Sequence, residues 1–166
     1  MQQLTLAPAS ALAGEVSIPG SKSISNRALL LAAMADGRTR IQNLLESDDT
    51  RHMLNALAAL GIEIEQADGE HIVDGVAGPL VKRDLELSLD LGLAGTAYRP
   101  LAAALTAGRG QFVLDGVPRM RERPVDPLVD GLRQLGAHID YLGEDGFPPI
   151  RVTGTGLNGG NVRMPG

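Results

Sequence analysis

Alternating apolar and polar positions predict a series of short strands along the chain. The clearest run covers residues 85–91, where every odd position is leucine, so we expect one face of the strand to be buried and the other to contact water. Shorter runs rich in β-forming residues predict further strands at residues 16–18, 62–64, 71–73, 112–114, 138–140 and 150–152.

A second kind of pattern predicts helices. Residues 28–35 and 101–107 are apolar on almost every side, and a helix of this composition belongs in a protein interior. Residues 49–60 and 128–135 instead carry one apolar stripe, and a glycine that can end a helix follows each of them. The order of buried helix, strand, amphipathic helix and strand therefore occurs twice.

The spacing of these patterns indicates an internal repeat. Gly20 and Arg27 stand seven residues apart, as do Gly92 and Arg99. A third copy is expected to begin at residues 162–166, where Val-Arg-Met-Pro-Gly follows the pattern of an earlier Val-Ser-Ile-Pro-Gly. The chain therefore contains two similar units and the beginning of another.

The repeat divides the chain into expected structural units. Residues 1–20 form an N-terminal strand segment, 21–82 the first unit, 83–156 the second, and 157–166 the start of a truncated third. A strand without its following helix leaves an unpaired edge and an open core layer. We therefore expect the chain to be part of a longer protein.

Composition and charge narrow the classes of function. The net charge of −5 argues against nonspecific binding to nucleic acid or to an anionic membrane, since both need a cationic surface. The absence of cysteine excludes a disulfide scaffold, a cysteine nucleophile and a thiolate metal site. His52, His71 and His138 lack metal-ligand spacing, so we expect no metal and no cofactor. Without a long apolar run or a basic leader, we expect a cytoplasmic protein.

A cationic segment joins the first predicted strand to the first buried helix. Gly20 permits a sharp turn, the serines beside it can cap free N–H groups, and Lys22 and Arg27 bring positive charge to the helix start. The helix dipole disfavours cations there by roughly 0.3–1 kcal/mol, and a bound anion would reverse that effect. The segment predicts either an anion site or an ordinary capped helix with two solvated cations.

The second unit places a similar segment at the corresponding point. Gly95 lets a backbone N–H group approach a ligand, Thr96 can cap the helix, and Arg99 again puts a cation near a helix start. Two units with cations at equivalent helix starts favour an anion site. The alternative is a glycine-rich turn whose arginine pairs with a carboxylate.

Two loops supply further candidates. Arg119, Arg121 and Arg123 alternate, so in an extended loop all three would point to one side and form a fork for phosphate or carboxylate. The alternative for these arginines is a solvated surface. Residues 47–50 predict a helix N-cap, with Asp49 as a candidate general acid or base.

Taken together, these motifs resemble those of the 5-enolpyruvylshikimate-3-phosphate (EPSP) synthase family, the 3-phosphoshikimate 1-carboxyvinyltransferases. The matching segments are PGSKSISNRA at residues 19–28, LLESDDTRHM at 44–53, AGTA at 94–97 with RPL at 99–101, and RMRERP at 119–124. The match runs in order to the last residue. It covers all of this chain, but only the N-terminal part of a typical family member.

The resemblance implies a fold and an activity. The family fold has two similar domains, each of three βαβαββ units in an inverse α/β barrel-like arrangement, with buried parallel helices whose N-termini face the cleft between the domains. Residues 1–20 would lie near the other domain. The implied reaction transfers the enolpyruvyl group of phosphoenolpyruvate to the 5-hydroxyl of shikimate 3-phosphate and releases phosphate, in the shikimate pathway to chorismate and aromatic amino acids. Glyphosate competes for the phosphoenolpyruvate site in this family.

The site residues that the resemblance implies follow from matching positions. For shikimate 3-phosphate they are Lys22, Ser23 and Arg27, and for phosphoenolpyruvate they are Lys22, Gly95 and Arg123. Lys22 is the catalytic candidate. The family's best candidates for proton transfer, an Asp and a Glu, lie in a C-terminal half outside this sequence, so we expect this chain to need that part as a partner and to be inactive alone.

Thr96, Arg99 and Asp49 are further candidates for the same site. Two positions depart from the family pattern: Leu93 stands where the family usually has Asn, and Tyr98 where it usually has Met. Leu93 removes an amide at the cleft, and Tyr98 adds bulk and a hydroxyl next to Arg99. Both departures bear on ligand affinity.

Two other functions remain open. A related enolpyruvyl transferase that acts on a UDP-amino sugar shares the fold and chemistry, but it expects an active-site cysteine, which this sequence lacks. A non-catalytic anion-binding or complementation module would show the same cationic helix starts without turnover.

Overall fold

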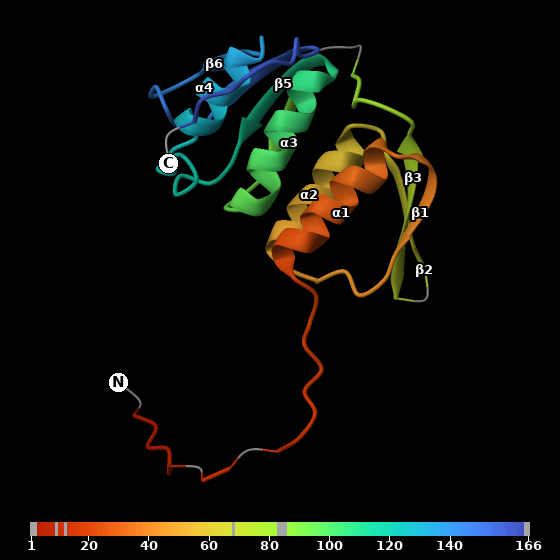
Figure 1. Cartoon of the computed structure of the whole chain (residues 1–166), viewed down its shortest axis with the longest axis vertical. Helices are drawn as coiled ribbons and strands as arrows, with labels where there is room; N and C mark the ends of the chain where they lie inside the picture. Colours follow the sequence, from red (N-terminus) through yellow and green to blue (C-terminus); the bar gives the residue numbers. More distant parts are fainter. Residues whose placement is uncertain (1–2, 9, 12, 68, 83–85, 165–166) are drawn as a thin grey trace.

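The computed structural model describes residues 3–8, 10–11, 13–67, 69–82 and 86–164. Its elements are α1 (Lys22–Met34), β1 (Asp36–Ile41), α2 (Asp48–Ala59), β2 (Glu63–Ala67), β3 (Glu70–Val76), β4 (Leu87–Asp90), α3 (Gly95–Ala107), β5 (Arg109–Asp115), α4 (Asp126–Gln134), β6 (His138–Tyr141) and β7 (Ile150–Thr155). Figure 1 shows the predicted mixture of helices and sheets. None of the described helices is long and apolar enough to cross a membrane.

The strands form two sheets with the same internal order. In the first sheet β3 lies between β1 and β2, and both pairs are antiparallel. In the second sheet β7 lies between β5 and β6 in the same way, and β4 adds a parallel strand beside β5. After each buried helix, the chain therefore follows the same path of strand, helix, strand and strand.

The helices α1 and α3 lie side by side and join the two sheets into one core (Figure 1). The helix α1 packs on β3, α3 packs on β7, and α2 packs against both helices. Leu29 and Ala33 of α1 and Leu101 and Leu105 of α3 have no exposed surface. This confirms the prediction that the two apolar helices pack in the core, where their buried side chains contribute to the hydrophobic stabilisation of the fold.

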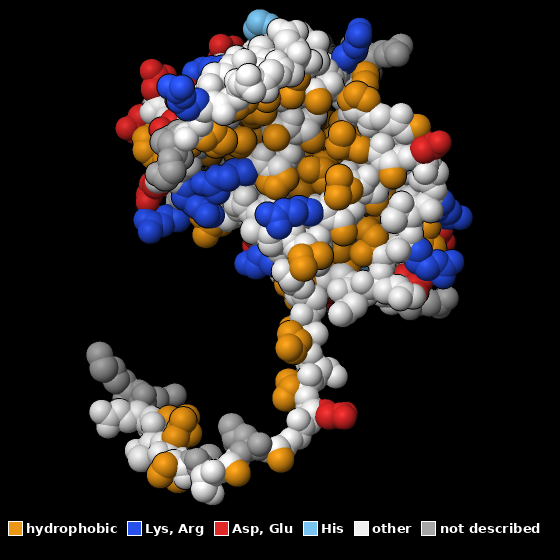
Figure 2. All heavy atoms as spheres, viewed as in Figure 1, with side chains coloured by type: hydrophobic (Ala, Val, Ile, Leu, Met, Phe, Trp, Pro, Cys, Tyr) orange, Lys and Arg blue, Asp and Glu red, His pale blue; other side chains and the backbone are white. Residues whose placement is uncertain are grey.

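One face of α1 differs from that prediction. Ile24 and Leu31 are 67% and 68% exposed, although the sequence favours burial on every side of the helix. Figure 2 shows hydrophobic side chains gathered on the face of the molecule that α1 and α3 present. The described residues therefore bury one side of α1 and leave another in contact with solvent.

The ends of the helices and some strands also differ from the predictions. Both buried helices begin six residues earlier than predicted, because their first turns contain polar residues that apolar periodicity does not detect. The strand β1 was not predicted, since its residues are largely exposed and do not alternate. Residues 13–19 are exposed and form no strand, and the N-terminal segment runs away from the rest of the molecule (Figure 1).

Some expectations fall outside the described residues. Leu85, where the leucine-rich strand was predicted to begin, is one of these positions, and the structure places the strand itself at Leu87–Asp90. Pro165 and Gly166 of the expected third unit are two others. The division of the chain at residues 82 and 156 stays a prediction.

Tyr98 lies in the core rather than at the cleft. Its side chain is 1% exposed, and its hydroxyl donates a hydrogen bond to the backbone oxygen of Leu114 at 3.0 Å. Burial raises the pKa of Tyr98 above its usual value, so the phenol stays neutral. The hydroxyl that the sequence puts next to Arg99 therefore faces the core, because α3 turns Tyr98 toward β5.

Two glycines let the buried helices approach their sheets closely. A Cβ atom at Gly75 of β3 would overlap the backbone oxygens of Ala35 and Ala32, at the C-terminal end of α1. In the second unit, a Cβ atom at Gly154 of β7 would lie 2.7 Å from the backbone oxygen of Leu105, at the C-terminal end of α3. The two units therefore use the same device to seat a helix on a strand.

This contact predicts a specific loss of stability. Gly75→Ala should lower the free energy of unfolding by about 1–3 kcal/mol, since the methyl group meets backbone that cannot move aside without shifting α1. Urea denaturation followed by circular dichroism measures the difference. Gly143→Ala is the control, because its Cβ would make an ordinary contact of 3.6 Å with Pro149. Equal stability of the two variants would contradict the proposed close packing.

Candidate active site

A cavity of about 570 Å³ lies where the N-terminal turns of α1, α2 and α3 meet. Each of these helices contributes a side chain to its wall, and the loop after β5 contributes an arginine. The lining residues are Lys22, Asp48, Asp49, His52, Gly92, Leu93, Ala94, Gly95, Thr96, Val117 and Arg123. Of the predicted site residues, Lys22, Asp49, Gly95, Thr96 and Arg123 are thus brought together.

The three helix starts at this cavity are not equivalent. The helix α2 has a complete capping box, in which Ser47 and Thr50 each accept a hydrogen bond from the other's backbone N–H group. This confirms the N-cap predicted at residues 47–50. By contrast, α1 and α3 have neither a side-chain cap nor an acidic residue in the first turn.

The missing caps leave backbone donors at the starts of α1 and α3, where Lys22 and Thr96 line the cavity. The N–H groups of Lys22, Ser23, Ile24 and Thr96 have no hydrogen-bond partner among the described residues. Such groups carry the positive end of the helix dipole, and they bind anions in many proteins. The serines of α1 do not cap them: Ser25 instead accepts a hydrogen bond from the Leu45 backbone at 3.1 Å.

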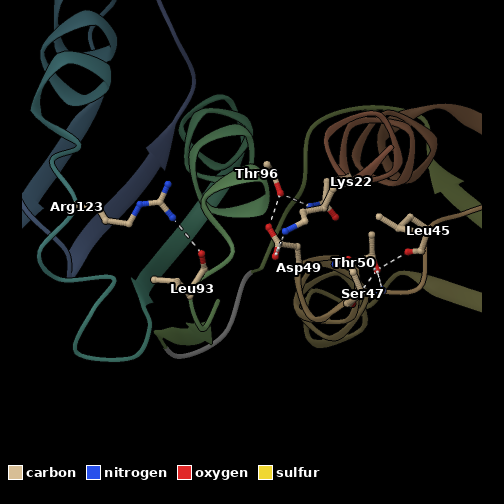
Figure 3. A network of polar contacts seen from close by, with 9 residues as sticks. Lys22, Leu45, Ser47, Asp49, Thr50, Leu93, Thr96 and Arg123 are labelled. Atoms are coloured by element: carbon tan, nitrogen blue, oxygen red, sulfur yellow. Dashed lines mark hydrogen bonds and ion pairs between the residues drawn. The ribbon is translucent and has the colours of Figure 1, made fainter. Parts of the chain in front are cut away.

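A chain of polar contacts connects the three helices at the cavity wall (Figure 3). The Nζ atom of Lys22 lies 3.2 Å from one oxygen of Asp49, and the hydroxyl of Thr96 donates to the other oxygen at 2.8 Å. The Lys22 side chain is 50% exposed, whereas that of Asp49 is 17% exposed. Asp49 therefore holds the lysine at the cavity while the ammonium group stays accessible.

Arg123 reaches the cavity from the opposite side. Its Nη1 atom donates to the backbone oxygen of Leu93 at 3.1 Å (Figure 3). A Cβ atom at Gly95 would lie 2.8–3.0 Å from three atoms of its guanidinium group. The N–H group of Gly95 itself donates to Leu93 at 2.9 Å. The absence of a side chain at Gly95 therefore admits the arginine, and the free backbone donor at this turn is that of Thr96.

His52 supports the turn that leads into α3, although nothing in its spacing indicated a role for it. Its Nδ1 atom lies 3.1 Å from the backbone oxygen of Asp90. Gly92 has a φ of 53°, and a Cβ atom there would overlap the His52 ring. The Asp90 carboxylate accepts the Gly92 N–H group at 2.8 Å. A left-handed glycine packed against a histidine therefore fixes the path of the chain to Leu93.

The predicted fork of three arginines does not form. The loop is a series of turns rather than an extended segment, with the Arg123 N–H group bonded to Met120 at 3.0 Å. Arg119 pairs with Glu122, and Arg121 pairs with Asp115 at 2.9 Å. Arg123 alone of the three lines this cavity, whereas Arg119 and Arg123 together line a neighbouring pocket of about 320 Å³.

The pair of Arg121 and Asp115 ties this loop to the end of β5. Burial works against the charge of Asp115. The hydrogen bonds from Arg121 and from the Gly116 backbone, together with the positive charge of Arg121, nevertheless hold the pKa of Asp115 below its usual value. The carboxylate is therefore ionised at neutral pH and keeps the arginine in place.

Three predicted site residues do not line this cavity. Arg27 is exposed on α1, and Ser23 is half-buried one residue after Lys22. Arg99 turns away and donates to the backbone oxygen of Pro124 at 3.0 Å. It therefore stabilises the loop that contains Arg119, Arg121 and Arg123. The assignment of Ser23 and Arg27 to shikimate 3-phosphate stays a prediction.

A repeated α/β fold, with buried helices that begin at a cavity lined by lysine and arginine, is the fold of the enolpyruvyl transferase class. The EPSP synthase from Acinetobacter baumannii matches 85% of this chain with a TM-score of 0.77 and 34% sequence identity, and the match covers 32% of that structure. The family model described as EPSP synthase (3-phosphoshikimate 1-carboxyvinyltransferase) matches residues 6–166. The chain belongs to the EPSP synthase family, and the resemblance seen in its motifs is confirmed.

Curated relatives agree with this assignment. The 3-phosphoshikimate 1-carboxyvinyltransferases of Shewanella halifaxensis and of a Sulfurovum species are 55% and 56% identical to this chain over 168 residues. Each match covers 100% of this chain and 39% of the relative. The chain therefore spans about two fifths of the length of these relatives.

The contact between Gly95 and Arg123 predicts how the cavity responds to a single methyl group. Gly95→Ala should displace the guanidinium group and weaken the binding of inorganic phosphate roughly tenfold, because a charged donor is lost from the site. Titration of the chain followed by ³¹P NMR measures the affinity. Gly131→Ala is the control, since its Cβ would meet Val162 at an ordinary 3.5 Å. Unchanged phosphate binding in Gly95→Ala would mean that Arg123 does not contribute.

Proposed function

We propose that this chain is the N-terminal part of a 3-phosphoshikimate 1-carboxyvinyltransferase. The complete enzyme would transfer the enolpyruvyl group of phosphoenolpyruvate to the 5-hydroxyl of shikimate 3-phosphate and release phosphate. The observation that carries this proposal is the convergence of Lys22, Arg123 and two uncapped helix starts on one cavity, in a chain that belongs to this family.

The substrates explain why such a cavity needs fixed positive groups. Phosphoenolpyruvate carries a phosphate and a carboxylate, and shikimate 3-phosphate carries a second phosphate and a second carboxylate. The negative charges of the two bound substrates therefore repel each other. Lys22 and Arg123 would offset this repulsion together with the free N–H group of Thr96. Because these groups are in place before the substrates arrive, they need little reorganisation during the reaction.

The reaction itself has two steps. In the addition, the 5-hydroxyl oxygen bonds to C2 of phosphoenolpyruvate, C3 gains a proton and the hydroxyl loses one. In the elimination, C3 loses a proton and the bond from C2 to the phosphate oxygen breaks. Lys22 would stabilise the charge that moves between the two substrates, and Arg123 would hold phosphoenolpyruvate.

In this proposal Asp49 positions Lys22, although a carboxylate in a cavity is also a candidate general acid or base. Both of its oxygens already accept contacts, one from Lys22 and one from Thr96. We assign it to holding Lys22 rather than to general acid or base catalysis. The family resemblance implies that the acid and base lie in the C-terminal part of the enzyme, outside this chain. That part would then be the partner that the activity requires.

A complementation experiment tests the function. The chain is mixed with the separately expressed C-terminal remainder of the Shewanella halifaxensis relative, and phosphate release is measured with both substrates. Activity that depends on both pieces and both substrates would support the proposal. No activity with two folded pieces would favour a non-catalytic anion-binding module, whereas activity with a UDP-amino sugar in place of shikimate 3-phosphate would favour the related transferase.

The proposal also predicts the effect of removing Lys22 or Arg123, which the same assay measures. Lys22→Ala and Arg123→Ala should each reduce phosphate release at least about 100-fold, because each removes a charge from the position where the substrates' negative charges meet. Arg38→Ala is the control, since Arg38 pairs with Glu65 and Asp74 on the first sheet and does not line the cavity. Normal binding of phosphoenolpyruvate by Arg123→Ala would show that this site is wrongly placed.

A further inference from the structure

We propose that Asn26 is a positioning residue of this site, acting on Lys22 through Thr96 and Asp49; the inference rests on the function proposed above. Asn26 lies in α1, one helical turn after Lys22, and its side chain has no exposed surface. Its Nδ2 atom donates a hydrogen bond to the Thr96 hydroxyl oxygen at 2.8 Å. Asn26 does not line the cavity, so it can influence a ligand only through its neighbours.

The hydrogen bonds of this chain run in one direction. A threonine hydroxyl has a single proton, and that of Thr96 is donated to Asp49 at 2.8 Å. Its oxygen can then only accept, and the amide N–H group of Asn26 is the donor that it meets. If the side chain at position 26 could only accept hydrogen bonds, it would compete with Asp49 for the single proton of the Thr96 hydroxyl. Asn26 thereby directs the Thr96 proton toward Asp49.

The cost of burying Asn26 indicates that it is not there for stability alone. Its Oδ1 atom is buried and has no hydrogen-bond partner among the described residues. An unpaired buried acceptor opposes folding, because the group has lost its bonds to water and gained none in return. A small apolar residue at the same place in α1 would avoid this penalty. What the amide adds is the single hydrogen bond to Thr96, at the edge of the cavity.

The bond from Thr96 decides how Asp49 meets Lys22. With one oxygen held by Thr96, Asp49 offers Lys22 the other at 3.2 Å, and the Lys22 side chain remains half exposed at the cavity. Released from Thr96, the carboxylate could turn both oxygens toward the lysine and neutralise more of its charge. Asn26 therefore keeps Lys22 available for an anionic substrate, and its loss should weaken substrate binding.

The test uses a full-length enzyme in which residues 1–166 replace the corresponding segment of the Shewanella halifaxensis relative. Asn26→Asp keeps the size of the side chain but replaces the N–H donor with an acceptor. It should raise the KM for phosphoenolpyruvate about tenfold with a much smaller change in kcat. Asn55→Asp, the same change at an exposed position of α2, should leave both constants unchanged. An unchanged KM in Asn26→Asp would overturn the inference.

A double-mutant cycle separates positioning from a merely structural role. If Asn26 acts through the Thr96 hydroxyl, then Asn26→Asp should add nothing to the effect of Thr96→Val, whereas independent effects would add. Thr96→Ser keeps the hydroxyl, so its KM should rise much less than that of Thr96→Val. Additive effects in the cycle would overturn the proposal.

Two further measurements keep the outcomes distinct. If Asn26→Asp does not fold, as judged by its thermal unfolding, the comparison of Thr96→Val with Thr96→Ser decides alone, and equal KM values for these two variants would overturn the proposal. An unsubstituted chimera that folds but neither binds phosphoenolpyruvate nor releases phosphate would instead contradict the proposed function.

Discussion

The site depends on the meeting of three helix N-termini inside one packed core. Because α1 and α3 are seated on their sheets through apolar contacts, their first turns are brought to the same place with free N–H groups and adjacent cations. Positive charge at the positive end of a helix dipole is unfavourable unless something negative is close. In this chain Asp49 supplies part of that charge, and the open cavity leaves room for a ligand to supply the rest.

Periodicity predicted the elements that depend on burial and missed those that do not. The four helices and most of the strands follow from apolar spacing, since one face of each element packs in the core. The strand β1 has almost no buried face, so it leaves no such pattern. The first turns of α1 and α3 were missed for the same reason: their residues serve the cavity and are polar.

The candidate site was predicted as a set of residue types, but not as a geometry. Lys22 and Gly95 were recognisable from cations and glycine near helix starts, and Arg123 from an arginine-rich loop that matches the family motif. The structure brings the three together. Arg119 and Arg121 do not line this cavity, because the loop forms turns and pairs them with Glu122 and Asp115, which alternation in sequence cannot detect. Asn26 and His52 were missed since their roles arise from contacts between distant segments.

The glycine contacts at the far ends of the buried helices bear on the geometry of the cavity. A helix of 13 residues is about 20 Å long, and α1 rests on Gly75 at the end opposite Lys22. A small rotation of the helix about this contact therefore moves its first turn. A tilt of about 3° at that contact would move the opposite end by about 1 Å, enough to disturb precise chemistry. Substitutions at the sheet end of α1 can thus change the geometry of the cavity without touching it.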